Sequence, residues 1–354
     1  MNVNGLEGVI AAETRLSDVD GERGRLILAG HDVESLAAGQ SFEAAAALFV
    51  GGTEAELRAE LGRGRKLAFE RLPSLGAALH ARDGMDALRA ATAQLADDTS
   101  PAEIIAAVGV FAAAWARRCA GESPVPPDER AGHAADLLRM LRGTRPSEPE
   151  VAAFGKYLVT VLDHGMNAST FTARVVASTA SDLVSCVVAA IGALKGPLHG
   201  GAPGPVLDML DAIARPDAAE AWLRRELEAG RRIMGMGHRI YRVRDPRAAV
   251  LEKALEALER AVPNAAVGGR LGVARAVEKS AEKLLAERHP DRPLKANVEF
   301  YTSVLLEAVG VPRTLFSPIF ASSRVVGWCA HVQEQKAHGR LIRPSSRYIG
   351  ALPR

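Results

Sequence analysis

Apolar residues recur every three to four positions along most of the chain, which is the spacing of one buried face of an α-helix. The pattern is clearest after Ser100, where a capping serine and a proline in the first turn mark a helix start. From there, apolar side chains fall at Ile104, Ile105, Val108, Phe111 and Trp115. Similar patterns predict helices over residues 150–162, 182–194, 217–233, 246–260, 272–287, 298–309 and 318–335.

Alternating polar and apolar residues, the pattern of a half-buried strand, are short and rare in this sequence. Residues 25–29 show it soon after Asp20-Gly21, a dipeptide that is typical of a tight hairpin turn. Alanine is abundant, as in the run that follows Glu43, and it has the highest helix propensity. We therefore expect a mainly all-α, multihelical fold with one small β-hairpin near the N-terminus.

The bulk composition argues against several classes of protein. The chain has 354 residues, 48% of them hydrophobic and 24% charged, which suits one large domain or two unequal ones. A net charge of +2 argues against a nucleic-acid or membrane-surface binder. The longest apolar stretch, residues 183–194, is shorter than the roughly 20 residues of a membrane span. The first residues do not resemble a secretory signal, and Cys119, Cys186 and Cys329 lie far apart, so a cytoplasmic location is expected.

Two histidines lie in glycine-rich breaks between predicted helices. His199 lies within KGPLHGGAPG at 195–204, and His238 ends the sequence GMGH at 235–238. Glycine allows the backbone to approach a ligand closely, and a neutral imidazole at such a place can donate a hydrogen bond to a carbonyl oxygen that becomes an enolate. Taken alone, such a residue is more often an ordinary loop histidine near a helix end.

An arginine-rich segment surrounds the second of these histidines. Residues 231–247 contain six arginines and one acid, and glycines interrupt the run. Exposed backbone N–H groups and forked guanidinium groups together suit a polyanionic ligand such as coenzyme A. A solvated basic face is the simpler interpretation, but a surface helix does not need the glycines. Nucleic acid fits less well, because no stacking aromatic residues are interleaved.

Three further segments carry weaker signals. Glu299 lies at the start of an apolar helix, where the helix dipole alone would favour an acid. His164 and Asn167 are three apart and can share one face of a turn, although Asn167 or Ser169 equally suits a helix cap. Arg324 stands in an apolar helical pattern and needs an anion, either an internal carboxylate or one on a ligand.

In this order and spacing, these segments resemble the citrate synthase family. The resemblance rests on LDHGMNASTFTAR at 162–174, KGPLHGGAPG at 195–204, RRIMGMGHRIYRVRDPR at 231–247, NVEFY at 297–301, SSRVVGW at 322–328 and RLIRP at 340–344. The opening at 5–26 is similar too, so the likeness covers essentially the full chain and is weakest over 52–150. It implies an almost wholly helical homodimer whose large domain comprises residues 1–202 and 310–354 and whose small domain comprises 203–309.

The resemblance also implies a role for each candidate residue. His199 contacts the thioester oxygen of acetyl-CoA and stabilises the enol, His238 polarises the ketone of oxaloacetate, and Glu299 removes the methyl proton. The oxaloacetate carboxylates are held by His164, Arg247 and Arg324, together with an Arg343 supplied across the dimer. The coenzyme A side is assigned to Gly235, Met236, Gly237, Arg242, Arg244 and Lys295. Acetyl-CoA is a co-substrate, and the implied acyltransferase reaction requires no metal or other cofactor.

One residue departs from the family pattern, because the usual base is aspartate and this chain has Glu299. A subgroup of bacterial relatives is similar in carrying NVEFY together with HGMNASTF. Slow turnover, or a non-catalytic paralogue that only binds coenzyme A or oxaloacetate, therefore stays open. Synthesis of 2-methylcitrate from propionyl-CoA also stays open, because one methylene changes binding by only about 1–3 kcal/mol.

A metal hydrolase is the alternative of another class. Asp163, His164, His199 and His238 would be its ligands. The sequence lacks an HExxH motif, and the nearby arginines would repel a cation, so this alternative is disfavoured.

Overall fold

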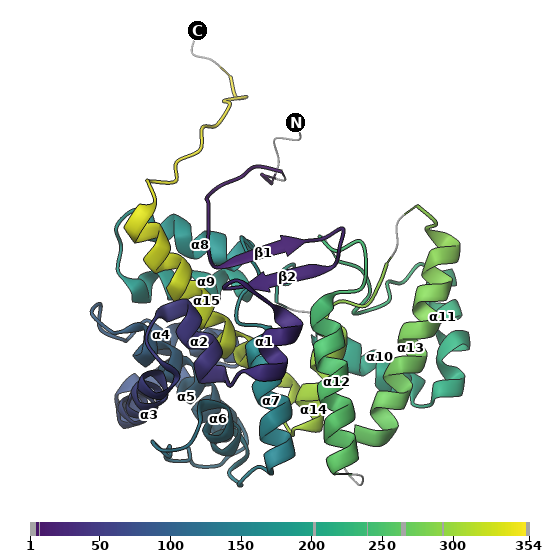
Figure 1. The fold of residues 1–354 in the computed structure, drawn as a ribbon, viewed down its shortest axis with the longest axis horizontal. Helices are drawn as coiled ribbons and strands as arrows, with labels where there is room; N and C mark the ends of the chain where they lie inside the picture. The colour runs from purple at the N-terminus through teal and green to yellow at the C-terminus, as the bar shows by residue number, and fades with distance from the viewer. Residues whose placement is uncertain are drawn as a thin grey trace.

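The computed structural model describes residues 5, 6, 8–200, 203–238, 240–262, 267–291 and 294–351. They form a helical body with a small antiparallel sheet along one edge (Figure 1). The strands follow the order β1-β2-β3, with β1 at Ser17–Asp20, β2 at Arg25–Leu28 and β3 at His31–Asp32. Asp20 is paired with Arg25 across the turn, which confirms the predicted hairpin.

Most helices that precede residue 200, together with the last helix, gather on one side of the molecule (Figure 1). They are α1 (Val33–Gly39), α2 (Phe42–Val50), α3 (Glu54–Arg71), α4 (Gly84–Thr92), α5 (Pro101–Cys119), α6 (His133–Arg142), α7 (Glu148–Thr160), α8 (Ala168–Ala177), α9 (Leu183–Leu194) and α15 (Phe316–His338). Helix α5 is buried at Ala102 and from Ile104 to Trp115, and it packs against α3, α4 and α15. It begins as predicted, because Ser100 and Glu103 form a reciprocal capping box.

The other helices lie on the opposite side, with α12 and α14 towards the centre (Figure 1). They are α10 (Pro203–Ile213), α11 (Ala219–Glu228), α12 (Pro246–Ala261), α13 (Val267–Arg288) and α14 (Val298–Ala308). Helix α12 packs against α1 and α7 of the first group and also against α13 and α14. The two groups therefore meet along α12, and the division of the chain into residues 203–309 and the remainder stays a prediction.

Helix ends differ from the predicted ones where local backbone chemistry intervenes. The helix expected over 217–233 ends at Glu228, because Gly230 adopts a φ of 73° that stops it. The helix expected from 272 instead begins at Val267. Within the described ranges, no helix combines the length and the apolar character that crossing a membrane requires.

Candidate active site

The segment that carries His238 is fastened to the segment that leads into α14. The N–H of Gly237 donates to the carbonyl of Lys295 (2.7 Å), and the N–H of Asn297 donates to the carbonyl of Gly235 (2.9 Å). The side-chain amide of Asn297 also donates to the carbonyl of Gly237 (2.9 Å). At Gly235, φ is 74° and a Cβ atom would lie 2.8 Å from the ring of Phe300, so the sequence needs glycine there. These bonds fix His238 relative to the start of α14.

The hydrogen bonds of His238 define which of its nitrogens carries the proton. Its Nδ1 accepts the backbone N–H groups of Ile240 (3.0 Å) and Tyr241 (3.1 Å). A backbone N–H can only donate, so the proton of the neutral ring resides on Nε2. Burial, helped by the charge of Arg247, lowers the pKa of His238 to about 4. His238 is therefore a neutral donor through Nε2 near pH 7.

The second glycine-flanked histidine has the opposite tautomer. Nε2 of His199 accepts the backbone N–H of Ser169 (3.2 Å), and the Ser169 hydroxyl lies 2.8 Å from the same nitrogen. The proton of the neutral ring therefore resides on Nδ1. Burial, and after it the charge of Arg324, lowers the pKa of His199 to about 4. Ser169 is held in turn by the Nε1 of Trp328, which donates to its hydroxyl (3.1 Å).

His164 lies beside His238. The two ring centroids are 5.6 Å apart, and Nε2 of His164 is 3.1 Å from the hydroxyl of Tyr241. Burial, with the charges of Arg247 and Arg324, holds the pKa of His164 well below its ordinary value. Asn167 takes the capping role instead, because its side chain accepts the N–H groups at the start of α8. The fold thus gathers neutral imidazoles around one arginine-rich region.

Arg324 is a buried cation that has no carboxylate partner among the described residues. Its side chain is 1% exposed, and Nε donates to the carbonyl of Val161 (2.8 Å). In the described part of the chain, Nη2 has no hydrogen-bond partner. Burial lowers the pKa of Arg324 to about 10, so it remains charged at pH 7. The sequence left open whether the anion that Arg324 needs is an internal carboxylate or a carboxylate of a ligand. No internal carboxylate of the described residues is bonded to Arg324, and its Nη2 is free to bind a ligand carboxylate.

Arg247 is also buried, but its guanidinium group is already engaged. Nε and Nη2 donate to the two carboxylate oxygens of Asp245 at 3.0 and 2.7 Å. Asp245 also caps α12 by accepting the backbone N–H of Arg247 (3.0 Å). This pair holds Arg247 in one orientation close to the ring of Tyr241, with its guanidinium carbon 6.0 Å from the centroid.

Glu299 is the second residue of α14, and its side chain points into the protein. Asn297 caps this helix by accepting the N–H of Glu299 (3.0 Å). Oε2 of Glu299 has no hydrogen-bond partner among the described residues. Burial raises the pKa of Glu299 to about 7, although Arg247 and Arg324 act to lower it. A carboxylate with a pKa near the working pH is well suited to accept and return a proton.

Tyr157 on α7 was not identified from the sequence. Its hydroxyl is fully buried and, like the free atoms of Arg324 and Glu299, is without a partner in the described ranges. Burial, and after it the charge of Glu299, keeps the pKa of Tyr157 well above its ordinary value. Tyr157 lies one turn before Val161, to which Arg324 is anchored. The sequence does not mark this tyrosine as a site residue, because ordinary core tyrosines stand in the same apolar helical pattern.

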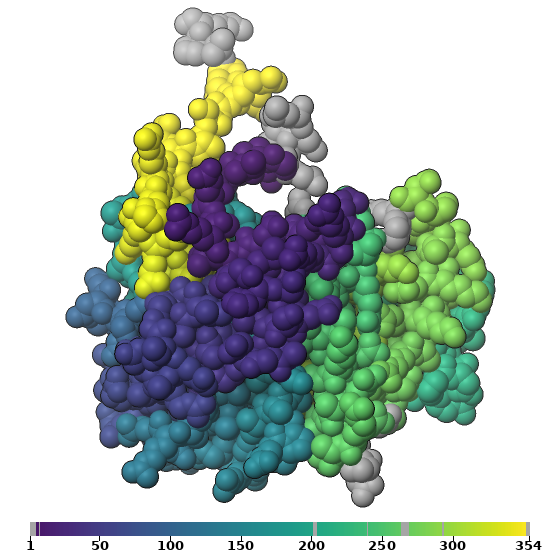
Figure 2. All heavy atoms as spheres, viewed as in Figure 1, coloured from purple at the N-terminus to yellow at the C-terminus, as the bar shows by residue number. Residues whose placement is uncertain are grey.

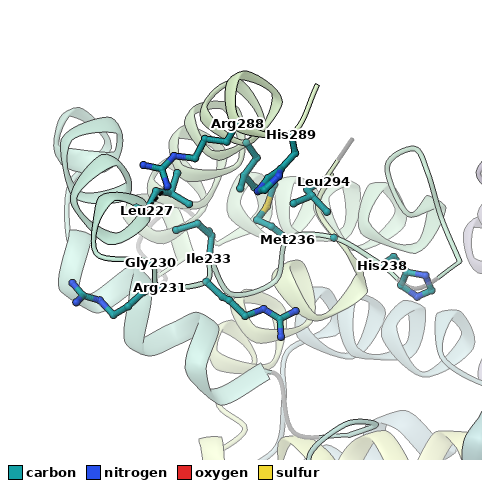
Figure 3. A pocket seen from close by; sticks show the side chains of 12 residues that line it. Leu227, Gly230, Arg231, Ile233, Met236, His238, Arg288, His289 and Leu294 are labelled. Carbon is teal, nitrogen blue, oxygen red and sulfur yellow. Dashed lines mark hydrogen bonds between the residues drawn. The ribbon is translucent and has the colours of Figure 1, made fainter. Parts of the chain in front are cut away.

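A cavity of about 500 Å³ opens beside the His238 segment (Figure 3). It is lined by Leu227, Gly230, Arg231, Arg232, Ile233, Met236, Gly237, His238, Leu285, Arg288, His289 and Leu294. Apolar side chains lie along the cavity from Leu227 to Leu294, and His238 stands at one end, away from Leu227 and Arg231 (Figure 3). The cavity therefore offers an apolar slot with several cationic groups and leads towards a neutral histidine donor.

The predicted coenzyme A residues are only partly placed at this cavity. Met236 and Gly237 line it, and Gly235 supports the same loop through its bond to Asn297. Arg244 pairs with Glu278 (2.7 Å) and Glu252 (2.7 Å), and Lys295 pairs with Glu282 (2.7 Å), while Arg242 is exposed. None of these last three lines the cavity. Arg231 and Arg232, which line the cavity, belong to the arginine-rich segment. Arg288 and His289 also line it, but they are far from that segment in the sequence and were not predicted.

Arg343 is not brought to the other site residues by this chain. It lies in the segment after α15, which extends away from the helical body (Figures 1 and 2). The tail also exposes Leu341, Tyr348 and Ile349 by 60%, 70% and 87%.

Comparison with known proteins gives one consistent family. The family model described as "Citrate synthase, C-terminal domain" matches residues 5–345. The citrate synthase of Haloferax volcanii is 38% identical over 98% of this chain and 95% of its own length. The crystal structure of citrate synthase from Thermotoga maritima is 33% identical, with a TM-score of 0.85 over 100% of this chain and 97% of that one. The Thermoplasma acidophilum enzyme, solved as a ternary complex with carboxymethyl coenzyme A and oxaloacetate, is 28% identical, with a TM-score of 0.86 over 99% and 96%.

Proposed function

Since the chain belongs to the citrate synthase family, we propose that it condenses acetyl-CoA with oxaloacetate and water to give citrate and CoA. The observation that carries this proposal is a pair of buried polar atoms that have no hydrogen-bond partner among the described residues: Oε2 of Glu299, whose pKa the charge of Arg324 acts to lower, and Nη2 of Arg324 itself. The related enzymes are citrate synthases, so neither 2-methylcitrate synthesis nor a metal hydrolase is favoured. A non-catalytic paralogue is left for experiment to test.

Oxaloacetate is held by cationic and neutral donors in this scheme. One carboxylate pairs with Nη2 of Arg324, and Arg247 and His164 contact the dianion from the neighbouring segment. The Nε2–H of His238 donates to the ketone oxygen and draws electron density away from the ketone carbon. The hydroxyl of Tyr157 joins the same cluster and donates to an oxygen of either the substrate or Glu299.

Carbon–carbon bond formation then follows from the positions of His199 and Glu299. The Nδ1–H of His199 donates to the thioester oxygen while a carboxylate oxygen of Glu299 takes a proton from the methyl group. The carbon of the resulting enolate attacks the ketone carbon, and the ketone oxygen takes up the proton that Glu299 removed, which regenerates the carboxylate. Water then cleaves the thioester and releases citrate and CoA. No step in this sequence needs a metal or a redox cofactor.

On the coenzyme A side, the loop at residues 235–237 keeps the role that the sequence predicted, whereas the cationic residues differ from the predicted ones. The backbone of Met236 and Gly237 receives the adenine end in the apolar slot. Arg232, Arg288 and His289 are the groups that meet the phosphates, because Arg244 and Lys295 are already paired with acids. Arg343 completes the oxaloacetate site of a second subunit in a homodimer.

Release of the CoA thiol tests the proposed reaction directly. Acetyl-CoA and propionyl-CoA are each supplied with and without oxaloacetate, and the free thiol is followed by a chromogenic disulfide reagent. We expect release only when oxaloacetate is present, and faster release from acetyl-CoA. Release that ignores oxaloacetate, or none with either thioester, would overturn the proposal. In the latter case, calorimetric binding of oxaloacetate would identify a non-catalytic paralogue.

A further inference from the structure

The turn of the N-terminal hairpin packs backbone to backbone against the segment that follows His238. The carbonyl of Gly21 accepts the N–H of Arg242 (2.9 Å). A Cβ atom at Gly21 would collide with the carbonyl oxygen of Ile240. At Gly24, where φ is 63°, a Cβ atom would lie 2.5 Å from Cγ2 of Val243. The backbone contact at Gly21 leaves no room for a side chain, and the positive φ at Gly24 favours glycine there, so the turn is fitted to this one segment.

The other end of β1 contacts the residues on either side of His164. The hydroxyl of Ser17 donates to Oδ2 of Asp163 (2.5 Å) and accepts the N–H of Gly165 (3.0 Å). Cγ2 of Val19 is 3.2 Å from the position that a Cβ atom at Gly165 would take. The hairpin therefore touches the segment of His164 through β1 and the segment of His238 through its turn, and β1 and β2 lie across the molecule above α1 and α12 (Figure 1).

We propose that the hairpin is a positioning element of the active site, in which Gly21 orients the peptide group that selects the tautomer of His238. The catalytic meaning of this role rests on the proposed function.

The planarity of one peptide bond connects Gly21 to His238. The carbonyl of Ile240 and the N–H of Tyr241 belong to the same rigid peptide group. Gly21 lies against the carbonyl side of that group, and its N–H side donates to Nδ1 of His238. A methyl group at Gly21 would rotate the peptide group and weaken that donation. Of the two N–H groups that hold Nδ1 as an acceptor, only that of Ile240 would remain in place, so the tautomer with the donor at Nε2 would be less firmly fixed.

The same displacement would reach His164. The hydroxyl of Tyr241 lies 3.1 Å from Nε2 of His164, and its ring centroid is 4.7 Å from that of His238. Since Arg242 and Val243 come next in the chain, the whole turn from 240 to 243 depends on the hairpin. The hairpin thus influences both imidazoles without touching either ring.

The test compares Gly21→Ala and Gly24→Ala with Gly30→Ala. Gly30 has a φ of 86°, and nothing lies within 4 Å of the position that its Cβ atom would take. Gly30→Ala therefore carries the same kind of backbone strain as Gly24→Ala but no contact with the site. The pKa of His238 is followed by NMR of protein labelled at its histidines, and steady-state kinetics are measured beside it. We expect Gly21→Ala to raise the pKa of His238 and to lower kcat/KM for oxaloacetate roughly tenfold, the effect of one lost hydrogen bond.

Gly24→Ala should change the same two quantities in the same direction by a smaller factor, because the Val243 side chain can move aside. Gly30→Ala should match the wild-type protein. The proposal is overturned if folded Gly21→Ala or, should that variant not fold, Gly24→Ala keeps the wild-type titration of His238, or if Gly30→Ala changes it equally. A wild-type protein without condensation activity would contradict the proposed function alone, since the titration of His238 is measured without substrate.

Discussion

At the scale of single residues, Glu299 is the strongest determinant of the proposed chemistry. One oxygen of its carboxylate is buried without a partner among the described residues, and burial raises its pKa to about 7. Because the folded-state pKa exceeds the unfolded one, this group binds a proton more tightly in the folded protein. Its contribution to stability is therefore fully present below about pH 4.5 and is lost as pH rises towards 7.

We expect Glu299→Gln to abolish exchange of the methyl protons of acetyl-CoA with deuterated solvent, because an amide does not accept that proton. The variant should fold, and above pH 7 it should be more heat-stable than the wild type, since it carries no buried charge. The wild-type kcat/KM should rise with pH through about 7 as the carboxylate of the free enzyme ionises. Retained proton exchange in the presence of a non-reacting oxaloacetate analogue would remove Glu299 as the base.

The Glu299→Asp variant tests whether the longer side chain of glutamate is poorly placed for proton removal or whether the backbone is fitted to it. The backbone at this position is fixed by Asn297, which is bonded to both Gly235 and Gly237. A shorter side chain on a fixed backbone falls short of the substrate, so we expect kcat to fall roughly 100-fold, as for an error of about 1 Å. A rise in kcat would instead mean that the longer side chain of the wild type is poorly placed.

Tyr157 gives a second prediction at this scale. In the described part of the chain its hydroxyl has no partner, so Tyr157→Phe should not lower the melting temperature. If the hydroxyl binds oxaloacetate or Glu299 during the reaction, kcat/KM should fall about tenfold, the effect of one hydrogen bond. Thr92→Val is the matched control, because its hydroxyl on α4 is also buried and unpartnered within the described ranges. Equal kinetic effects of the two substitutions would deny Tyr157 a place in the site.

At the scale of helices and strands, capping and turn residues in the sequence predicted the elements whose ends those residues determine. Ser100 and Pro101 marked the start of α5, and Asp20-Gly21 marked the hairpin. The end of α11 was predicted too late, because the apolar spacing continues past Gly230 while the backbone turns there. Spacing reports which residues share a face, whereas a single positive φ decides where a helix ends.

The candidate site shows the same division between local and long-range information. His199, His238 and Arg324 were identified from the sequence because they lie in distinctive segments. The structure then brings His164 and His238 together. The pairing of Arg244 with Glu278 was not predictable, because the two residues meet only through the packing of α12 against α13. Arg288 and His289 were missed for the same reason, since they reach the cavity from the far end of α13.

At the scale of the whole molecule, the segment after α15 is the feature that a single chain does not explain. It extends from the body and exposes Leu341, Tyr348 and Ile349, which is unusual for apolar side chains of this size. A second copy of the chain would cover them and would bring Arg343 to the other subunit's site. We therefore propose that the protein is a dimer with active sites shared between subunits.

Mixing two inactive variants tests this arrangement. His238→Ala and Arg343→Ala should each be inactive alone, the first because it loses the ketone donor and the second because it loses a carboxylate contact. In a mixed dimer, one site carries both defects and the other carries neither, so subunit exchange should restore up to half of the wild-type activity per mixed dimer. Exchange is verified by native mass spectrometry with one variant isotopically labelled. Proven exchange without any recovery would place Arg343 in its own subunit's site or outside the site altogether, and the exposed apolar tail would then need another partner.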